Sequence, residues 1–517
     1  MHTRPPFTLG DMIENNAGRY PDDTAFVFED QRPTHRQFAA RARRLASAWY
    51  RRGARRQDRI GILAMNCLEY CEVYGASELA GYITATVNFR LAPPEMAFII
   101  NDSAPRILVF EEQYSEVIGT LRPQLKSVET FVCIGAAPAW AEEYEAVLAS
   151  GDAAGAPIRS TEEDLSALVY TSGTTGRPKG CMRGQREDVC GAEILGSDML
   201  CTPADRFLLM MPLFHIGAKI MQMAQHWRAG AVVLHRNFDP ELILKTIEAE
   251  RITVAHMAPT MIQTLLESPS IGKHDVSSLR MIVYAAAPMP TPVLRHGLKV
   301  FGNVFQQQYG QTEGPGTTLL CHQHRPDGTV QDIRRLGSVG QASPSVQIRV
   351  VGEDDIDCTI GEPGEILIRS GAMMRGYWNN SAATIEALRD GWVHTGDVGK
   401  LDEDGFLYLV DRKKDMIISG GENIYSREVE EALVQHPAVS EAAVIGVPDK
   451  KWGESVRAII VLRRGQTAAS EELIAHCVTL IASYKKPKSV VFADELPKLP
   501  SGKVNKVALR QSYGDAG

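Results

Sequence analysis

Short apolar runs recur between residues 60 and 284, and longer segments with helical periodicity separate them. Each run has the length of a buried strand. Strands that alternate with helices predict an α/β architecture with largely parallel sheets. The runs lie at residues 60–65, 107–110, 130–134, 165–170, 207–211, 231–235 and 281–284.

The pattern changes near Asp411, where shorter strands and tight turns begin. Apolar strands at 442–447 and 458–462 flank a Pro-Asp-Lys-Lys turn. We therefore expect a large N-terminal domain at residues 1–411 and a small α+β C-terminal domain at residues 412–517. The stretch 136–164, rich in Ala, Gly and acidic residues, is expected to form a loop and a peripheral helix.

Composition narrows the class of protein. A chain of 517 residues is too long for one hydrophobic core, and its 44% hydrophobic and 23% charged residues are typical of globular proteins. The net charge of -8 argues against nucleic acid as a partner. The arginines between positions 43 and 56 are interpreted as a solvated helix face.

Cysteines and hydropathy indicate a cytoplasmic protein. The nine cysteines are scattered and form no CxxC pair, so neither a disulfide framework nor a zinc site is predicted. No run of about 18 uncharged apolar residues occurs, and no signal peptide follows Met1. We expect no membrane span.

A loop rich in glycine and hydroxyl residues follows the apolar strand that ends at Tyr170. Its backbone N–H and side-chain O–H groups are suited to phosphate oxygens, and its lysine adds a positive charge. The spacing is not that of a Walker A loop, because Gly180 follows the lysine. A polar, flexible turn is the alternative. The predicted phosphate-binding residues are Thr171, Ser172, Gly173, Thr174, Thr175, Gly176 and Lys179.

This segment resembles the signature loop of the adenylate-forming superfamily, which includes acyl-CoA synthetases, firefly luciferase and peptide-synthetase adenylation domains. The resemblance implies an acyl-CoA synthetase-like fold. Its larger domain would bind ATP and an acid, and its small domain would be mobile.

A second motif, Gln308-Tyr-Gly-Gln-Thr-Glu-Gly314, matches the YGxTE segment of that family. The resemblance implies that Tyr309 stacks on adenine, that Thr312 contacts the α-phosphate, and that Glu313 holds Mg²⁺ together with Thr171. Gly310 would border both the nucleotide and the acyl group. A surface turn with polar residues is the alternative.

The turn after Tyr284 matches the family's adenine-side turn, usually written GGAP. Ala286 and Ala287 stand where that turn carries glycine, and they are still expected to contact the nucleotide through their backbone. Asp397, in His394-Thr-Gly-Asp397, and Arg412 resemble the family's ribose clamp, since a carboxylate can accept both ribose hydroxyls.

Three further positions carry family roles in the C-terminal region. Lys414 resembles the hinge about which the small domain turns, and Gly420 and Gly421 resemble the loop that lines the coenzyme A tunnel. Lys503, in Leu499-Pro-Ser-Gly-Lys503, resembles the catalytic lysine that bridges the carboxylate and the α-phosphate.

The sequence leaves the identity of the acid open. His215 occupies the family position beside the acyl pocket, and the absence of charge at residues 210–217 favours an apolar acid, fatty or aromatic. The run Gln306, Gln307 and Gln308 is unusually polar, which leaves a short polar acid open.

The motifs together predict an ATP-dependent, Mg²⁺-requiring ligase that converts an organic acid to an acyl-adenylate and transfers it to coenzyme A. Two alternatives remain. One is an adenylation enzyme that loads a carrier protein, and the other is a nucleotide-binding regulatory protein with a decayed site. The expected partners are the acid, ATP and coenzyme A, and a homodimer is left open.

Overall fold

The computed structural model describes residues 7–171, 178–412, 415–419, 422–449, 451–498 and 503–514. The chain divides into two compact units. The first comprises Met1–Ile348 and Ile368–Val393, and the second comprises Arg349–Leu367 and His394–Gly517.

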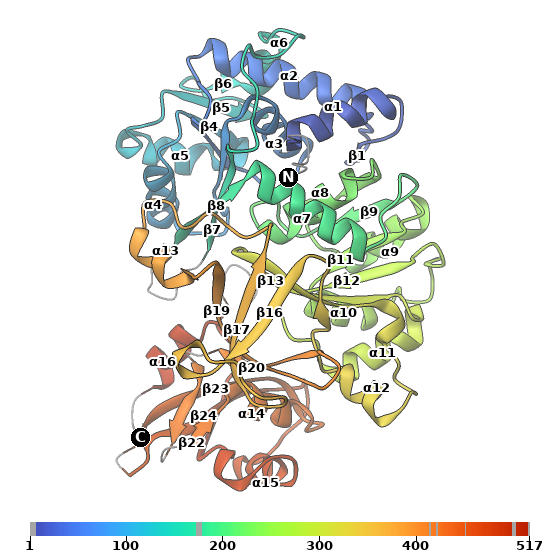
Figure 1. The fold of residues 1–517 in the computed structure, drawn as a ribbon, viewed down its shortest axis with the longest axis vertical. Helices are drawn as coiled ribbons and strands as arrows, with labels where there is room; N and C mark the ends of the chain where they lie inside the picture. The colour runs from blue at the N-terminus through green and yellow to red at the C-terminus, as the bar shows by residue number, and fades with distance from the viewer. Residues whose placement is uncertain are drawn as a thin grey trace. The chain divides into compact units, whose positions relative to one another are not determined.

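A sheet of seven described strands forms the first half of unit 1 (Figure 1). All its neighbouring strands with printed register run parallel except β7 and β8, which form an antiparallel hairpin. In spatial order the strands are β6 (Glu142–Glu143), β5 (Thr130–Ile134), β4 (Ile107–Glu111), β2 (Arg59–Leu63), β3 (Ile83–Thr86), β7 (Leu165–Thr171) and β8 (Lys179–Gly184).

A second sheet of eight described strands forms the other half of unit 1. It is parallel from β1 to β13, and antiparallel from β13 to β15. In spatial order the strands are β1 (Phe26–Val27), β10 (Ala231–Leu234), β9 (Arg206–Leu209), β11 (Val254–Met257), β12 (Met281–Tyr284), β13 (Phe305–Gln311), β14 (Gly314–Leu319) and β15 (Gln341–Ala342).

Helices cover both faces of each sheet, as parallel βαβ connections require. Several begin with the side-chain caps that their sequences predict; Thr34, for example, accepts from the backbone N–H of Gln37 at the start of α2. The helices of unit 1 are α1 (Leu9–Arg19), α2 (His35–Arg51), α3 (Leu68–Ala80), α4 (Pro93–Ser103), α5 (Ser115–Leu121), α6 (Tyr144–Ala149), α7 (Gln185–Asp198), α8 (Ile216–His226), α9 (Pro240–Ala249), α10 (Pro259–Leu266), α11 (Thr291–Phe301), α12 (Val330–Arg335) and α13 (Ser381–Ala387).

The largest core cluster lies between the two sheets of unit 1. It combines buried residues of α2, α3 and α8 with the inner faces of both sheets, and includes Trp49 and Phe207. A second cluster joins α4 and α5 to the outer face of the seven-stranded sheet. A third joins α9, α10 and α11 to the outer face of the eight-stranded sheet. Unit 1 is therefore layered, with helices between its sheets and outside each of them.

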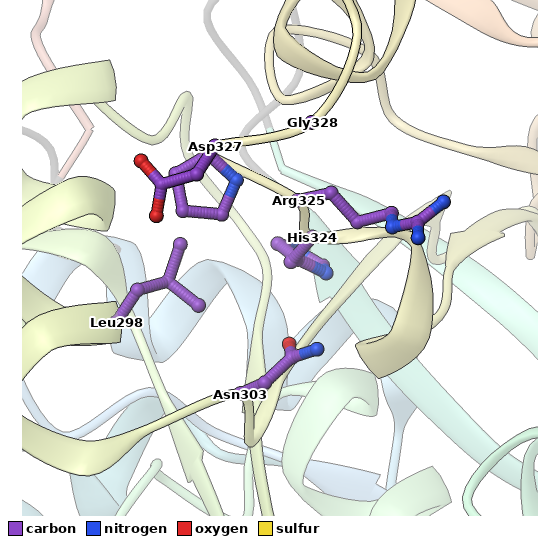
Figure 2. A pocket seen from close by; sticks show the side chains of 7 residues that line it. Leu298, Asn303, His324, Arg325, Asp327 and Gly328 are labelled. Carbon is purple, nitrogen blue, oxygen red and sulfur yellow. The ribbon is translucent and has the colours of Figure 1, made fainter.

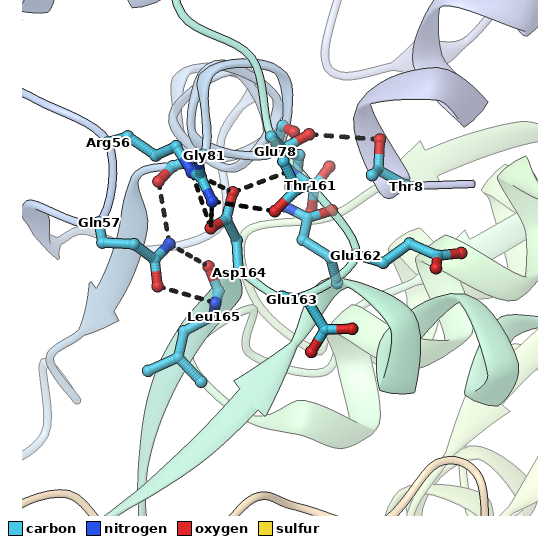
Figure 3. Close-up of polar contacts among 12 residues, drawn as sticks. Thr8, Arg56, Gln57, Glu78, Gly81, Thr161, Glu162, Glu163, Asp164 and Leu165 are labelled. Carbon is cyan, nitrogen blue, oxygen red and sulfur yellow. Dashed lines mark hydrogen bonds and ion pairs between the residues drawn. The ribbon is translucent and has the colours of Figure 1, made fainter. Parts of the chain in front are cut away.

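A polar network holds the start of β7, the strand that leads into the predicted phosphate loop (Figure 3). Asp164 accepts from the Nε of Arg56 at 2.9 Å and from the backbone N–H of Thr161 at 2.8 Å. Gln57 bonds both the backbone N–H of Leu165 and the carbonyl of Gly81. Arg56, and likewise Arg43 and Arg52 of the same arginine-rich stretch, thus form ion pairs with carboxylates of unit 1.

The chain passes between the two units inside three strands of a third sheet, β16, β17 and β19. Its described strands, in spatial order, are β16 (Val346–Val351), β17 (Gly364–Ser370), β19 (Trp392–Leu401) and β18 (Leu388–Arg389), with β20 (Leu407–Arg412) also paired to β19.

The remainder of unit 2 is a small α+β fold. The long antiparallel hairpin of β23 and β24 is its centre, and α14 and α15 pack on it around Val429 and Leu473. Its strands are β22 (Glu422–Ile424), β21 (Ile417–Ser419), β24 (Gly453–Leu462), β23 (Val439–Asp449) and β25 (Ser489–Phe492), and its helices are α14 (Ser426–Val434), α15 (Ser470–Leu480) and α16 (Lys506–Tyr513).

The predicted fold class is confirmed: a large N-terminal region with mainly parallel α/β sheets precedes a small α+β C-terminal region. The domain boundary at 411/412 stays a prediction, because the compact units interleave in sequence between residues 349 and 394. Among the described residues, no helix is long and apolar enough to cross a membrane.

Candidate active site

The β7–β8 hairpin carries the ends of the predicted phosphate loop. Thr171 lies directly opposite Lys179 in the ladder. The hydroxyl of Thr171 and the ammonium group of Lys179 therefore belong to paired residues of the two strands. Five predicted cradle residues lie outside the described residues: Ser172, Gly173, Thr174, Thr175 and Gly176.

Gly180 packs closely against the opposite strand of this hairpin. A Cβ at that position would lie 3.0 Å from Cζ of Tyr170, its partner across the ladder. The Tyr170 hydroxyl in turn donates to Asp102 at 2.6 Å. A side chain after Lys179 would therefore crowd the aromatic ring that anchors the strand.

Thr312 and Glu313 form the tight turn between β13 and β14, since Gln311 and Gly314 are the last paired residues. The backbone carbonyl of Thr312 accepts from Arg183 at 3.1 Å, and Arg183 is itself held by Asp188 at 2.8 Å. Both members of that ion pair are buried. A charged pair of this kind gives the turn a rigid support.

Tyr377 links the two motifs, and the sequence analysis did not identify it. Its hydroxyl donates to Oε1 of Glu313 at 2.6 Å, and Nζ of Lys179 lies 5.2 Å from the centroid of its ring. Burial, followed by the charge of Glu313, raises the pKa of Tyr377 above its ordinary value, so the phenol remains a donor.

The backbone holds Tyr377 beside β8. Cys181 and Tyr377 form an antiparallel bridge, and the backbone N–H of Trp378 donates to the carbonyl of Gly180 at 2.7 Å. The N–H of Tyr377 donates to the Thr384 hydroxyl at 2.9 Å. The one sequence signal for this residue was an adjacent aromatic pair, Tyr377-Trp378, in a segment without strand periodicity.

The donor set of Thr171 and Glu313 fits the expected Mg²⁺. Both residues offer oxygen ligands, which this ion prefers. The carboxylate of Glu313 accepts from Tyr377 through Oε1, and an ionised carboxylate keeps further oxygen lone pairs for a metal ion.

Tyr309 and Gly310 continue β13 just before that turn, and a register shift separates them. Gly316 makes room for the Tyr309 ring, because a Cβ there would lie 2.9 Å from Cδ1 of Tyr309. Gly310 is exposed.

The predicted adenine-side turn follows β12. Ala286 has φ of 73°, a left-handed conformation that favours glycine, whereas Ala287 is not among the positive-φ residues. The hydroxyl of Tyr284, just before the turn, is hydrogen-bonded to Nε2 of His324 at 2.9 Å. His324 also lines a hollow of about 330 Å³ near Asn303 and Arg325, shown in Figure 2, which contains no predicted site residue.

His215, the predicted acyl-pocket residue, immediately precedes α8, and its ring is tilted by 50° against that of Phe214, with centroids 4.3 Å apart. It lies at the edge of the core between the two sheets, which includes Phe214.

Asp397 and Arg412, the predicted ribose residues, are brought together in unit 2. They face one another across β19 and β20, and Nε of Arg412 lies 3.2 Å from Oδ1 of Asp397. Asp397 is buried, whereas Arg412 is exposed, so the pair presents a guanidinium at the surface of its unit.

Lys503 is exposed, and the residue that follows it is held by backbone pairing. Lys498 and Val504 form a bridge, and Asn505 caps α16 through the backbone N–H of Ala508 at 3.0 Å. Lys414, Gly420 and Gly421 lie outside the described residues.

Comparison with known proteins identifies this assembly of motifs. The family model for AMP-binding enzymes matches residues 13–378, and the model for the C-terminal domain of AMP-binding enzymes matches residues 428–503. The chain is similar to the long-chain-fatty-acid–CoA ligase FadD13 of Mycobacterium tuberculosis, with 34% identity over 511 residues and 98% of each chain covered.

A second relative and a solved structure to which the chain is similar are named for other acids. The feruloyl-CoA synthase of Amycolatopsis sp. is 36% identical over 511 residues, covering 98% of this chain and 99% of the relative. A solved structure of the anthranilate CoA ligase AuaEII, in complex with anthranoyl-AMP, superposes with a TM-score of 0.90 at 27% identity, covering 99% of this chain and 98% of that one.

Proposed function

Because the chain belongs to the AMP-binding enzyme family and is an AMP-forming acid–CoA ligase, we propose that it activates a fatty or aromatic carboxylic acid. ATP would convert the acid to an acyl-adenylate, with release of pyrophosphate, and coenzyme A would accept the acyl group with release of AMP. The observation that carries this proposal is the link from Lys179 through Tyr377 to Glu313. It joins the two motifs assigned to the triphosphate.

In the first half-reaction, an oxygen of the acid's carboxylate attacks the α-phosphorus of ATP, and the bond to the β-phosphate oxygen breaks. Binding and orientation of the two substrates supply most of the acceleration of such a displacement. The residues proposed to bind the nucleotide are Thr171, Ser172, Gly173, Thr174, Thr175, Gly176, Lys179, Ala286, Ala287, Tyr309, Gly310, Thr312, Asp397, Arg412 and Lys503.

Thr171 and Glu313 would hold Mg²⁺, which supplies neutralisation of charge on the phosphates. The chain's own contribution is to orient the carboxylate of Glu313. Tyr377 holds one oxygen of Glu313, and the turn between β13 and β14 fixes its backbone.

Lys503 is the proposed catalytic cation of the first half-reaction, because its charge stabilises the phosphoryl oxygens during displacement. In the second half-reaction the thiol of coenzyme A attacks the acyl carbon, and AMP leaves. We assign residues 412–517 to a domain that turns about Lys414 between these steps, with Gly420 and Gly421 beside the thiol arm. Gly310 and His215 would border the acyl group.

The two half-reactions can be assayed apart in Lys503→Ala. Acid-dependent pyrophosphate release should fall by a factor of about 100 or more, whereas thioester formation from supplied acyl-adenylate should persist. Lys498→Ala is the matched control, since Lys498 lies five residues earlier, carries the same charge and is held by Glu441 at 2.9 Å. Equal loss of both half-reactions in Lys503→Ala would refute its role.

The acceptor is tested by the wild-type chain with ATP, the acid and coenzyme A alone. Thioester formation without any carrier protein supports the ligase. Pyrophosphate release without thioester formation would favour a carrier-loading adenylation enzyme.

A further inference from the structure

Three polar side chains share one face of the eight-stranded sheet. In the ladder, His256 on β11 lies beside Val283 on β12, and Val283 lies beside Gln306 on β13. Neighbouring residues of parallel strands point to the same face, and two strand spacings separate His256 from Gln306 by about 10 Å. Gln308 is two positions further along β13 and shares that face. We call His256, Gln306 and Gln308 the polar row.

The polar row faces the core between the two sheets. Leu209 and Val283, its register neighbours, belong to that core. Gln307 alternates to the other face, where it lies beside Tyr284 in the ladder. The glutamine run in the sequence is therefore divided, with two members on the inner face and one on the outer face.

The polar row is buried but not satisfied. His256 is 2% exposed and Gln306 is 1% exposed. Neither ring nitrogen of His256 has a hydrogen-bond partner in the described part of the chain, and the same holds for Nε2 of Gln306 and of Gln308. Leaving a buried polar group unpaired costs about 1–3 kcal/mol, so four such nitrogens on one face need an explanation.

The start of α8 lies against His256 of this row. A Cβ on Gly217 would lie 3.8 Å from Cε1 of His256, so the second residue of the helix passes over the imidazole. His215, two residues earlier, is the proposed acyl-pocket residue. β13 also runs from the two glutamines to Gly310, the other residue proposed to border the acyl group. The polar row thus shares β13 with Gly310, and its His256 lies beside the start of α8, the helix that His215 precedes. The labels β11, β12 and β13 in Figure 1 mark the part of the sheet that carries the row and Val283.

The chemistry of the row is that of neutral hydrogen bonding. Burial lowers the pKa of His256 to about 4, so the imidazole is uncharged near neutral pH and offers one donor and one acceptor. The amide nitrogens of Gln306 and Gln308 are donors. Lys219 of α8 does not provide a counter-charge for a ligand, because Glu78 holds its Nζ at 2.7 Å.

We propose that the polar row selects an uncharged acyl body that carries hydrogen-bonding oxygen, with hydroxyl-bearing acids as its substrates. This inference rests on the proposed ligase function and specifies its acid. Oxygen on the acyl body accepts from Gln306 or Gln308, and a hydroxyl donates to or accepts from His256. A plain hydrocarbon tail leaves all four nitrogens unpaired, and sites built to pair a hydroxyl discriminate strongly against analogues that lack it.

The test uses acids that differ only by hydroxyl groups. Pyrophosphate release with coenzyme A is measured for cinnamate against its 2-, 3- and 4-hydroxy derivatives, and for hexanoate and decanoate against their terminal hydroxy derivatives. We expect at least one hydroxy acid to exceed its parent about 10-fold or more in kcat/KM, the effect of one well-paired hydrogen bond.

Variants locate the selectivity. Gln306→Leu, Gln308→Leu and His256→Phe should each lower the ratio of kcat/KM for the hydroxy acid to kcat/KM for its parent acid. Gln307→Leu is the matched control, because its side chain points to the opposite face and the ratio should not change. If the leucine variants fold poorly, the proposal is tested by the ratio of hydroxy acid to parent acid in Gln306→Met, compared with the same ratio in the wild type.

If the wild-type enzyme uses each parent acid with the same kcat/KM as its hydroxy derivatives, the proposed selectivity is wrong, while the ligase function stands. A preference that survives all three row substitutions would also overturn the proposed selectivity, and ordered water would then account for the buried nitrogens. If no acid releases pyrophosphate, the proposed function fails and this inference fails with it.

Discussion

The hydroxyl of Tyr377 donates to Oε1 of Glu313 at 2.6 Å, although the two residues are 64 positions apart in the chain. The same ring lies beneath Nζ of Lys179, at 5.2 Å from its centroid. One side chain therefore positions an acidic and a basic group of the proposed triphosphate site. Its own place is set by backbone pairing with β8 and by Thr384.

Tyr377→Phe removes this donor while keeping the ring. Because a hydrogen bond to a charged group contributes about 1.5–3 kcal/mol, we expect kcat/KM for pyrophosphate release to fall by a factor of about 10–100. The concentration of Mg²⁺ that gives half-maximal rate should rise, since the carboxylate of Glu313 loses its orientation. The measurement is a Mg²⁺ titration of the rate.

Tyr408→Phe is the control for that variant, because the Tyr408 hydroxyl also donates to a carboxylate, Asp402, at 3.1 Å. Its Mg²⁺ dependence should match the wild type. An unchanged Mg²⁺ requirement in Tyr377→Phe would show that the contact serves packing alone.

Arg412→Lys should raise KM for ATP by a factor of about 10 or more and leave KM for coenzyme A nearly unchanged. Lysine keeps the charge but loses the forked geometry that Arg412 presents beside Asp397. Steady-state kinetics with each substrate varied gives both constants. Arg427→Lys, at a surface pair with Glu431, is the control, and equal effects in the two variants would exclude a ribose contact for Arg412.

The turn at Ala286 predicts an unusual response to glycine. Ala286 has φ of 73°, which costs an alanine roughly 1 kcal/mol, so Ala286→Gly relieves strain that offsets the larger entropy of the unfolded chain. Ala287→Gly relieves no such strain. We expect the glycine variant at 286 to be about 1 kcal/mol more stable than the one at 287 by chemical denaturation. The reverse order would contradict the left-handed conformation.

Stability should fall in mild acid because of His256. Burial holds its pKa at about 4, below the value near 6.5 of an exposed histidine, so the unfolded chain binds the extra proton between these pH values. Stability from this group is therefore present above pH 6.5 and is lost as the pH falls towards 4. Between pH 7 and pH 5 the loss is about 2 kcal/mol.

His256→Phe should show a correspondingly smaller loss of unfolding free energy between pH 7 and pH 5. His296→Phe, at an exposed position, should keep the wild-type loss. Identical pH dependence in His256→Phe and the wild type would indicate that the imidazole is not buried in its neutral form.

Local patterns in the sequence were sufficient for the sheets of unit 1. Apolar runs such as 107–110 and 231–235 became strands because a strand covered on both faces is continuously apolar. The pairing of Asp397 with Arg412 was expected from motif order, and their positions in register across β19 and β20 bring the two side chains together.

Other features depend on contacts that no local pattern contains. Tyr377 reaches Glu313 through a segment that pairs with β8, and that pairing has no periodic signature. The alternation of Gln306 and Gln307 between two faces needs the strand register, and the left-handed Ala286 needs the backbone itself. Assignments at Lys414, Gly420 and Gly421 stay predictions.

The central claim is that activation of the acid precedes, and does not require, transfer to coenzyme A. Isotope exchange between pyrophosphate and ATP, measured without coenzyme A, tests it most directly. We predict exchange that depends on the acid and on Mg²⁺, with AMP as the nucleotide product once coenzyme A is added. No exchange without coenzyme A, or formation of ADP and phosphate, would contradict the acyl-adenylate mechanism.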